Sequence, residues 1–374
     1  MILEKNQPTQ TNRSKYIQIY INEQFASMIN LSQLIKGRKK LFFVISVVSA
    51  LLLPSIWFGL GHVIAKQALA VPHGCGMWES NTPTNWTVDD DWESFEPWAD
   101  SEQRISMRKD FDAKPWQFDS YETINFTSSD GINLEGWYVE VNSSSPVVIF
   151  VHGGYENGKC KPEILLSASY LSKNNFNVFM IDLRNHGNSE IVSDYFYLGQ
   201  KEYLDVLAAY DWLMVEKNYN PSSIGIVSIS TYSLATTLAF DESEIGAMWL
   251  DSPIIDFPLL VGNELERLGF PRILASPAIT MGERLVGVSL EDRVPLEVAS
   301  RAGDRPMYLV HGDSDVRISN EHSKKFYDKA VEAEANVTLW LVDDSAHVDA
   351  LWEYSQEYES RLVNFFSNSL ESKS

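Results

Sequence analysis

Residues 223–240, SIGIVSISTYSLATTLAF, carry the pattern that decides the fold of this 374-residue chain. The first part, Ser223–Val227, is a short and nearly continuous apolar run, which is typical of a parallel strand buried on both faces. From Thr231 to Phe240 the apolar residues recur with helical spacing instead. The two parts meet at SISTY, Ser228–Tyr232, so we expect a serine, Ser230, on a tight turn between a strand and a helix.

Similar apolar runs lie on both sides of this stretch, and segments with helical spacing separate them. The runs are Pro146–Val151, Asn177–Ile181, Ala247–Leu250, Pro306–Val310 and Thr338–Val342. The helical segments are Gly199–Val215, Pro258–Leu268, Ile279–Val286, Asn320–Ala335 and Ala350–Phe366. Before them, Tyr121–Thr127 and Ile132–Val141 predict a hairpin, since the intervening Asp-Gly suits a tight turn. The alternation predicts an α/β fold with a mostly parallel, doubly wound, eight-stranded sheet.

Residues that can perform chemistry follow several of these strands. The segments at the strand ends are His152-Gly-Gly154, Asp182–Ser189, His311-Gly-Asp-Ser-Asp315 and Asp343-Asp-Ser-Ala-His347. Because ligands of doubly wound sheets bind at the carboxyl ends of the strands, we expect these segments to form one site.

A metal site is not expected. The seven histidines show no H-x-x-x-H or H-x-H pairing, and Cys75 and Cys160 have no CxxC spacing. We therefore expect no metal and no cofactor. Two cysteines leave a single disulfide bridge open as a possibility.

Five sequence blocks, taken in chain order, resemble those of the α/β-hydrolase superfamily. They are HGG, D-x-R-x-x-G-x-S, the serine turn, HGDSD and SAH. The resemblance extends from about Arg108 to Phe366. It is greatest to serine esterases and peptidases, particularly to membrane-anchored bacterial members without a large lid. Each block is weakly specific by itself, but their order at successive strand ends is specific.

The resemblance implies a catalytic triad of Ser230 as nucleophile, Asp315 as acid and His347 as general base. It assigns the oxyanion hole to the backbone N–H groups of Thr231 and of Gly154 or Tyr155. Each assignment has an alternative: the serine could cap the helix, Asp313 could replace Asp315, and the histidine could be a surface loop residue. His152, His186 and His311 are interpreted as structural.

The chain departs from the family pattern G-x-S-x-G, because Ser228 and Tyr232 occupy the positions of the two glycines. Serine is a small replacement. A tyrosine needs room, so either the turn has opened, or the ring points away or covers the mouth of the site. This departure raises a second hypothesis, that the domain is catalytically impaired and acts as a binding or scaffolding module.

The N-terminal part predicts a membrane anchor. Residues 1–40 hold seven Lys and Arg against two Glu, and the next 25 residues, 41–65, contain no Asp, Glu, Lys or Arg. Such a run is long enough to span a bilayer, and its basic flank predicts a cytoplasmic tail over 1–40 and an extracytoplasmic domain. A cleaved signal peptide, ending at Ala68-Leu-Ala70, is the alternative.

Residues 66–107 form an acidic linker or strap with four tryptophans, which we expect to pack onto the hydrolase domain of residues 108–370. The whole chain carries a net charge of −21, which disfavours nucleic acid as a partner. We therefore expect a single-pass membrane-anchored serine hydrolase acting on a small ester, thioester or amide. Its oligomeric state is not predicted.

Overall fold

The computed structural model describes residues 10–71, 73–88, 108, 110–154 and 158–373. The chain divides into two units, Met1–Gly59 and Leu60–Ser374. Helix α1 (Gln10–Ala68) makes up the described part of the first unit, and its last residues, from Leu60 on, belong to the second. Within α1, the part Lys36–Ala68 is long and apolar enough to cross a membrane. The helix thus continues beyond both ends of the predicted span at 41–65.

The second unit is built on one sheet of eight strands with the order β1-β2-β4-β3-β5-β6-β7-β8. The strands are β1 (Glu122–Thr127), β2 (Asn133–Val139), β3 (Val147–Val151), β4 (Asn177–Ile181), β5 (Ile224–Ile229), β6 (Ala247–Asp251), β7 (Met307–Gly312) and β8 (Val337–Val342). The pairs β1–β2 and β2–β4 are antiparallel, and the other pairs are parallel. β3, β4, β5, β6 and β7 are buried along their whole length, because helices cover both faces.

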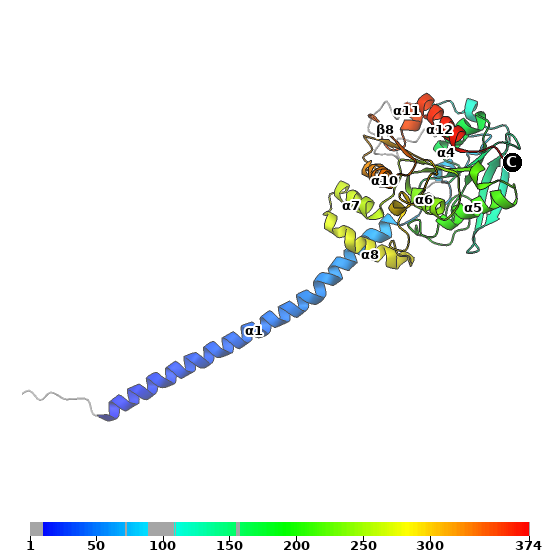
Figure 1. Cartoon of the computed structure of the whole chain (residues 1–374). Coiled ribbons are helices and arrows are strands. Elements are labelled where there is room, and N and C mark those ends of the chain that lie inside the picture. The colour runs from blue at the N-terminus through cyan, green and yellow to red at the C-terminus, as the bar shows by residue number, and fades with distance from the viewer. Residues whose placement is uncertain (1–9, 72, 89–107, 109, 155–157, 374) are drawn as a thin grey trace, which may run out of the picture. The chain divides into compact units, whose positions relative to one another are not determined.

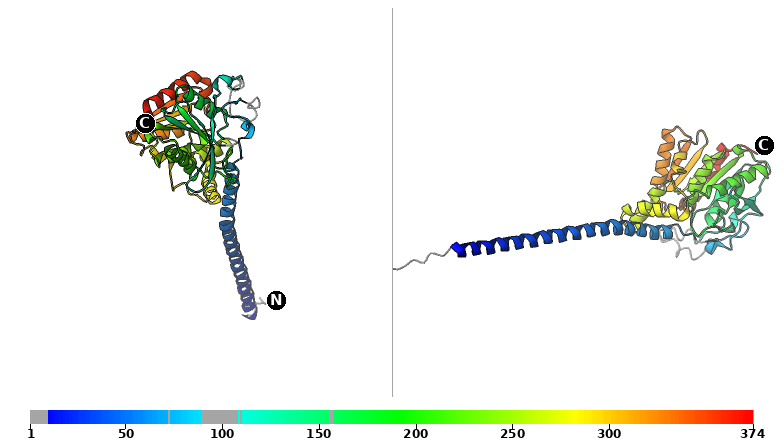
Figure 2. Two further views of the ribbon diagram at one scale, coloured as in Figure 1. Left: turned by 90° about the vertical axis from the view of Figure 1, so that its right-hand side faces the viewer. Right: turned by 90° about the horizontal axis from the view of Figure 1, so that it is seen from below.

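Helices lie on both sides of the sheet (Figure 1, Figure 2). The α-helices are α4 (Pro162–Lys173), α5 (Tyr203–Val215), α6 (Ser233–Asp241), α7 (Phe257–Arg267), α8 (Ala275–Val286), α9 (Pro295–Val298), α10 (Glu321–Glu332), α11 (Ala350–Glu353) and α12 (Ser355–Ser369). The 3₁₀ turns are η1 (Gly76–Trp78), η2 (Lys114–Trp116), η3 (Pro221–Ser223), η4 (Ser230–Tyr232) and η5 (Arg272–Leu274). Side chains of α5, α6, α9 and α10 enter one apolar core, and those of α4 and α12 enter the other.

The predicted fold class is confirmed: the sheet has eight strands, is mostly parallel and is wound on both sides. Each predicted apolar run became a strand, with ends shifted by no more than a few residues. β5 continues past Val227 to Ile229, so the strand brings Ser230 directly to the edge of the sheet. Helix α4 was not among the segments named from the sequence. Ten of its twelve residues are buried. Its exposed polar face is therefore too narrow to produce a clear helical spacing of apolar residues in the sequence.

A disulfide joins Cys75 to Cys160, with 6.3 Å between the two Cα atoms. It ties the segment after α1 to the loop before α4. Trp78 and Trp86, in the same segment, pack into the core on the side of α4. The tryptophans at positions 92 and 98 lie outside the described residues. The bridge and the two indoles together fix residues 75–88 onto the domain.

Removing this disulfide should destabilise the domain, because the bridge closes a loop of 85 residues in the unfolded chain. Loop entropy alone gives roughly 4–5 kcal/mol for a loop of this length, and measured losses are commonly about 2–5 kcal/mol. We expect the double variant Cys75→Ser/Cys160→Ser to show this loss in urea unfolding of the detergent-solubilised chain. Wild-type protein under reducing conditions is the matched control and should behave like the variant. Equal urea midpoints for the reduced and oxidised wild type would contradict the expectation.

Candidate active site

Ser230 stands at the sharp turn between β5 and α6. Its φ angle is +59°, in the left-handed region that side chains other than glycine rarely adopt. Such a conformation costs on the order of 1–3 kcal/mol and persists only where the surrounding structure fixes it. Here the buried strand β5 precedes the serine and the buried helix α6 follows it. The strained turn projects the hydroxyl beyond the carboxyl edge of the sheet, as a nucleophile requires.

Three residues predicted from the sequence meet in one hydrogen-bonded chain. Ser230 Oγ lies 2.9 Å from His347 Nε2, and His347 Nδ1 lies 2.8 Å from Asp315 Oδ2. The residues follow β5, β8 and β7, which bring their ends together at the same edge of the sheet. With Asp315 ionised, His347 must donate from Nδ1, so Nε2 is free to accept the serine proton. This arrangement can activate a hydroxyl nucleophile.

The carboxylate of Asp315 is fixed and kept ionised by its surroundings. Burial by itself raises its pKa, but the charge and hydrogen bond of His347, with a further bond from His311, hold the pKa well below its usual value. Its other oxygen accepts the backbone N–H groups of Arg317 and Ile318, at 2.9 and 2.7 Å. Four donors therefore orient this carboxylate toward the imidazole.

Asp313, the alternative acid, forms hydrogen bonds with residues other than His347. Its side chain accepts the N–H of Asp344 at 2.8 Å and the hydroxyl of Ser314 at 3.1 Å. These contacts tie the loop after β7 to the loop after β8, and Asp313 itself is exposed. The geometry thus favours Asp315 as the partner of His347, and it gives Asp313 a structural role.

Gly154 and Thr231, two residues assigned to the oxyanion hole, face each other closely. A Cβ atom added at Gly154 would lie 3.0 Å from both Cβ and Oγ1 of Thr231. Any larger residue at position 154 would therefore push the loop after β3 away from the serine turn. Tyr155, the third candidate, lies outside the described residues. The loop after β3 and the serine turn are therefore in close contact at these two residues.

A small apolar cavity of about 50 Å³ opens beside these two residues. Its lining includes Phe196, Ile254, Phe257 and Leu260, together with the segment that follows α1. Ala70 and Val71 belong to that segment, and Ala68, the last residue of α1, also lines the cavity. Arg317 is the single charged residue among those that line the cavity. A cavity of this size and polarity suits a short apolar acyl chain.

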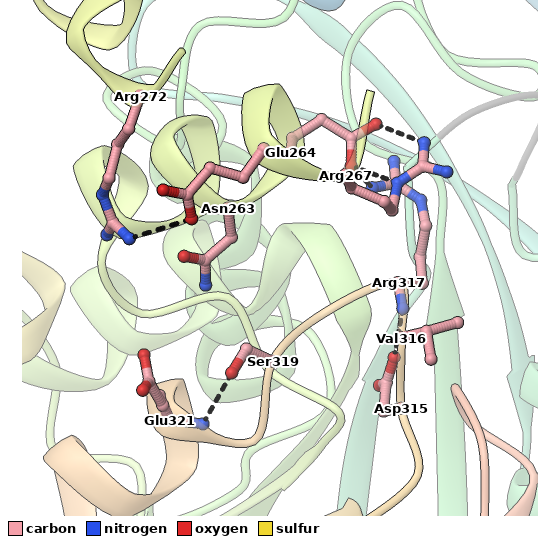
Figure 3. Close-up of a pocket in the computed structure, with 10 residues that line it drawn as sticks. Asn263, Glu264, Arg267, Arg272, Asp315, Val316, Arg317, Ser319 and Glu321 are labelled. Carbon is pink, nitrogen blue, oxygen red and sulfur yellow. Dashed lines mark hydrogen bonds and ion pairs between the residues drawn. The ribbon is translucent and has the colours of Figure 1, made fainter. Parts of the chain in front are cut away.

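A larger, polar groove of about 340 Å³ is also lined by Arg317 (Figure 3). Asp315 reaches this groove from the loop after β7, and α7 forms the opposite wall. Arg317 and Arg267 both pair with Glu264, at 3.2 and 2.7 Å. Arg317 thus contacts both the apolar cavity and the polar groove.

Tyr232 fills the position where the family pattern has glycine. The ring is 1% exposed and packs edge-on against His152, His186 and Phe196, with ring centroids 5.1–5.3 Å apart. Its hydroxyl lies 3.2 Å from His186 Nε2. The strand-to-helix turn has therefore not opened; the ring points into the domain and forms one wall of the 50 Å³ cavity.

The two histidines beside Tyr232 are structural, as the sequence predicted. Burial lowers the pKa of His152 to about 4 and that of His186 to about 3, so both rings are neutral at pH 7. His152 Nε2 accepts the N–H of Leu183 at 3.2 Å, which leaves Nδ1 as the protonated nitrogen. Neither ring reaches Ser230 in the way His347 does, so they support the wall that Tyr232 forms.

A network that the sequence analysis missed supports the loop of His347. The N–H of Val348 donates to Ser252 Oγ at 3.1 Å, and Ser252 donates to Asp251 at 3.0 Å. Tyr358 donates to the other oxygen of Asp251 at 2.9 Å, and burial raises the pKa of Asp251 to about 6. These residues do not touch the serine, so they position the histidine. Their signal was available, because Asp251-Ser252 directly follows the apolar run of β6.

The D-x-R-x-x-G-x-S corner is also structural. Arg184 pairs with the buried Asp205 at 2.7 Å and with Asp130 at 2.7 Å. Asp182 pairs with the buried Lys159, which also contacts Glu135 at 2.9 Å. These ion pairs hold the loop that carries His186 against Tyr232. Lys159 was not recognised in the sequence, because it belongs to no motif.

Among the residues that the structure describes, no group of three or more His, Cys, Asp or Glu could hold a metal ion.

Comparison with known proteins identifies relatives over the second unit. No family model matches the chain. The protein YfhR of Escherichia coli O157:H7 is 28% identical over 271 residues, covering 68% of this chain and 83% of that protein. The thiohydrolase aneE of Aspergillus aculeatus is 26% identical over 230 residues, covering 60% of this chain and 65% of the relative. The structure of the Pyrococcus furiosus esterase Pf2001 superposes with a TM-score of 0.56 at 25% identity, covering 70% of this chain and 97% of the esterase. Such neighbours indicate a hydrolase.

Proposed function

Since the chain is a member of the α/β-hydrolase superfamily, we propose that it is a serine hydrolase that cleaves carboxylic esters, thioesters or small amides through an acyl-enzyme. The observation that carries this proposal is the hydrogen-bonded chain Ser230–His347–Asp315. The turn keeps its strained geometry despite Ser228 and Tyr232. This favours an active enzyme over the second hypothesis, an impaired binding module.

In the proposed mechanism, Ser230 Oγ attacks the substrate carbonyl while His347 Nε2 takes its proton. The carbonyl oxygen gains a negative charge, which the amides of Thr231 and Gly154 stabilise. His347 then returns the proton to the leaving group, which departs and leaves the acyl chain on the serine. Water then attacks the acyl carbonyl while His347 removes its proton; the bond to Ser230 Oγ breaks, His347 returns the proton to Oγ, and the acid is released. Asp315 stays ionised throughout and stabilises the imidazolium.

The cavities narrow the class of substrate. The 50 Å³ cavity beside the oxyanion residues is the proposed acyl site, and its small size favours acyl groups of a few carbons. The 340 Å³ polar groove is the proposed leaving-group site, where a hydroxylated or charged group can contact Arg317. The likeness to an esterase and a thiohydrolase supports oxygen and sulfur esters as substrates.

The proposal is tested with the purified full chain in detergent and nitrophenyl esters of increasing acyl length. We expect a rapid release of one nitrophenol per enzyme, followed by slower steady turnover, because the acyl-enzyme accumulates. Acetyl or butyryl esters should react faster than dodecanoyl esters. No turnover of any ester or thioester above the buffer rate would contradict the proposed activity.

We further propose that α1 anchors the domain to a membrane, with residues 1–40 in the cytoplasm and the hydrolase domain outside it. The disulfide between Cys75 and Cys160 supports this orientation, because such bridges form and persist in oxidising compartments. The basic flank of the charge-free run supports it independently.

Protease treatment of intact cells or spheroplasts tests the orientation. We expect the region after Lys66 to be digested from outside, because no membrane would protect it. A tag placed before residue 40 is the internal control and should survive until detergent is added. Protection of both regions in sealed cells would overturn the proposed orientation.

A further inference from the structure

An exposed apolar tip joins α7 to α8. It consists of Leu268, Phe270 and Ile273, whose side chains are 54%, 50% and 66% exposed. The tip is well formed: Gly269 takes a φ of +79° after α7, and the N–H of Phe270 bonds to the carbonyl of Leu265 at 2.8 Å. Three large apolar side chains within six residues of a folded turn mark an interaction surface.

This tip lies close to the end of α1 that enters the domain. The charge-free run begins at Leu41, and about 20 residues of helix cross the hydrocarbon core. The far edge of the core then falls between about Leu60 and Ala65, so Gly61 lies close to that edge. Gly61 packs directly on α8, since an added Cβ would lie 2.8 Å from Cβ of Pro277. Pro277 is four residues beyond Ile273, so the tip lies close to the residues at which α1 joins the domain.

Other contacts support this placement. Gly282 of α8 lies against Leu69, so α8 runs beside the last residues of α1. On that segment, Leu60 and Val63 are 48% and 61% exposed, which continues the apolar surface from the helix onto the domain. Figure 1 shows α7 and α8 next to each other on the side of the domain where this segment enters.

This proposal rests on the proposed function and on the proposed membrane anchor. We propose that Leu268, Phe270 and Ile273 insert into the surface of the bilayer and hold the 340 Å³ polar groove close to it. Arg267 and Arg272 flank the tip and also line the 340 Å³ groove (Figure 3). On this proposal the site takes esters presented at the bilayer surface. The two flanking arginines are each paired with a carboxylate, Arg267 with Glu264 and Arg272 with Glu266, so we expect the contact with lipid to be mainly apolar.

A single fluorophore tests the insertion directly. Both cysteines are in the disulfide, so a cysteine replacing Phe270 is the single free thiol that can be labelled with NBD. In phosphatidylcholine vesicles containing the full chain, we expect a blue-shifted emission and about twofold quenching by doxyl-labelled lipid. Val215→Cys, on α5 and 70% exposed, is the matched control and should show water-like emission without quenching.

Two results of this measurement would overturn the proposal. One is an NBD group on Phe270→Cys that emits as in water and is not quenched by the labelled lipid. The other is a blue shift that depends on protein concentration but not on the labelled lipid, because a second copy of the chain would then cover the tip. Neither result depends on hydrolase activity. The labelling experiment can therefore contradict membrane insertion even if the proposed hydrolase function is correct.

A kinetic comparison tests the consequence for the substrate. The triple variant Leu268→Ser/Phe270→Ser/Ile273→Ser should hydrolyse a water-soluble butyryl ester at the wild-type rate. Its turnover of an ester embedded in the same vesicles should fall about tenfold, because the groove is no longer held at the surface. Equal rates of wild type and variant on the embedded ester would overturn the proposal. The soluble ester shows separately whether the catalytic site works.

Discussion

Ser230→Ala should lower kcat for ester hydrolysis by at least about 10⁴-fold, with little change in the thermal midpoint. The substitution removes the nucleophile and leaves the imidazole without its proton donor. His347→Ala should lower kcat by a similar factor, because the serine then has no base. Since the two residues act as one unit, the double variant should be no slower than either single variant. Steady-state kinetics on a butyryl ester measures all three.

The two aspartates after β7 provide the control for this series. Asp315→Asn should cost several orders of magnitude in kcat, because the amide cannot hold the correct imidazole tautomer. Asp313→Asn changes a carboxylate that bonds to Asp344 and Ser314 and should leave kcat within about twofold. Retained full activity in Ser230→Ala would move the nucleophile to another residue. Equal losses from the two aspartate variants would contradict the assigned acid.

Tyr232→Ala should both enlarge the acyl cavity and destabilise the domain. Replacing a buried aromatic ring by alanine costs about 3–5 kcal/mol, and this ring contacts two loop histidines and Phe196. The space left by the ring adjoins the 50 Å³ cavity, so hexanoyl and octanoyl esters should gain relative to acetyl ester. Urea unfolding and the chain-length profile of kcat/KM measure the two effects.

Tyr232→Phe is the matched variant for this experiment. It keeps the ring and removes only the hydroxyl that lies near His186, so it should leave the acyl preference unchanged. The expected loss of stability is about 0.5–1.5 kcal/mol, the usual net contribution of one hydrogen bond. An unchanged chain-length profile in Tyr232→Ala would mean that the ring does not limit the acyl site.

The strands and the residues at their ends could be predicted from the sequence because both follow from local rules. Continuous apolar runs have to be buried on both faces, and a doubly wound sheet then brings their carboxyl ends together. Ser230 and His347 are 117 residues apart. Topology predicted that the strand ends share one site, and the resemblance to α/β-hydrolases implied that these two residues pair there. Asp315 was preferred over Asp313 by the family pattern, and the hydrogen bonds to His347 agree with that preference.

The supporting contacts could not be predicted, since they depend on which side chains meet across the fold. Nothing near Lys159 in the sequence indicates that it is buried against Asp182 and Glu135. The direction of the Tyr232 ring was left open, because it depends on the space that His152, His186 and Phe196 leave. Likewise, the pairing of Cys75 with Cys160 requires knowing that residues 75–88 return to the loop after β3.

The most direct test of the proposed activity is the site at which a fluorophosphonate reacts with the full chain. Such a probe phosphonylates a serine only when a neighbouring base and an oxyanion hole activate it. We expect one adduct per chain, and mass spectrometry of the digested protein should locate it on Ser230. An unlabelled protein, or an adduct on a different serine such as Ser228, would contradict the proposed triad.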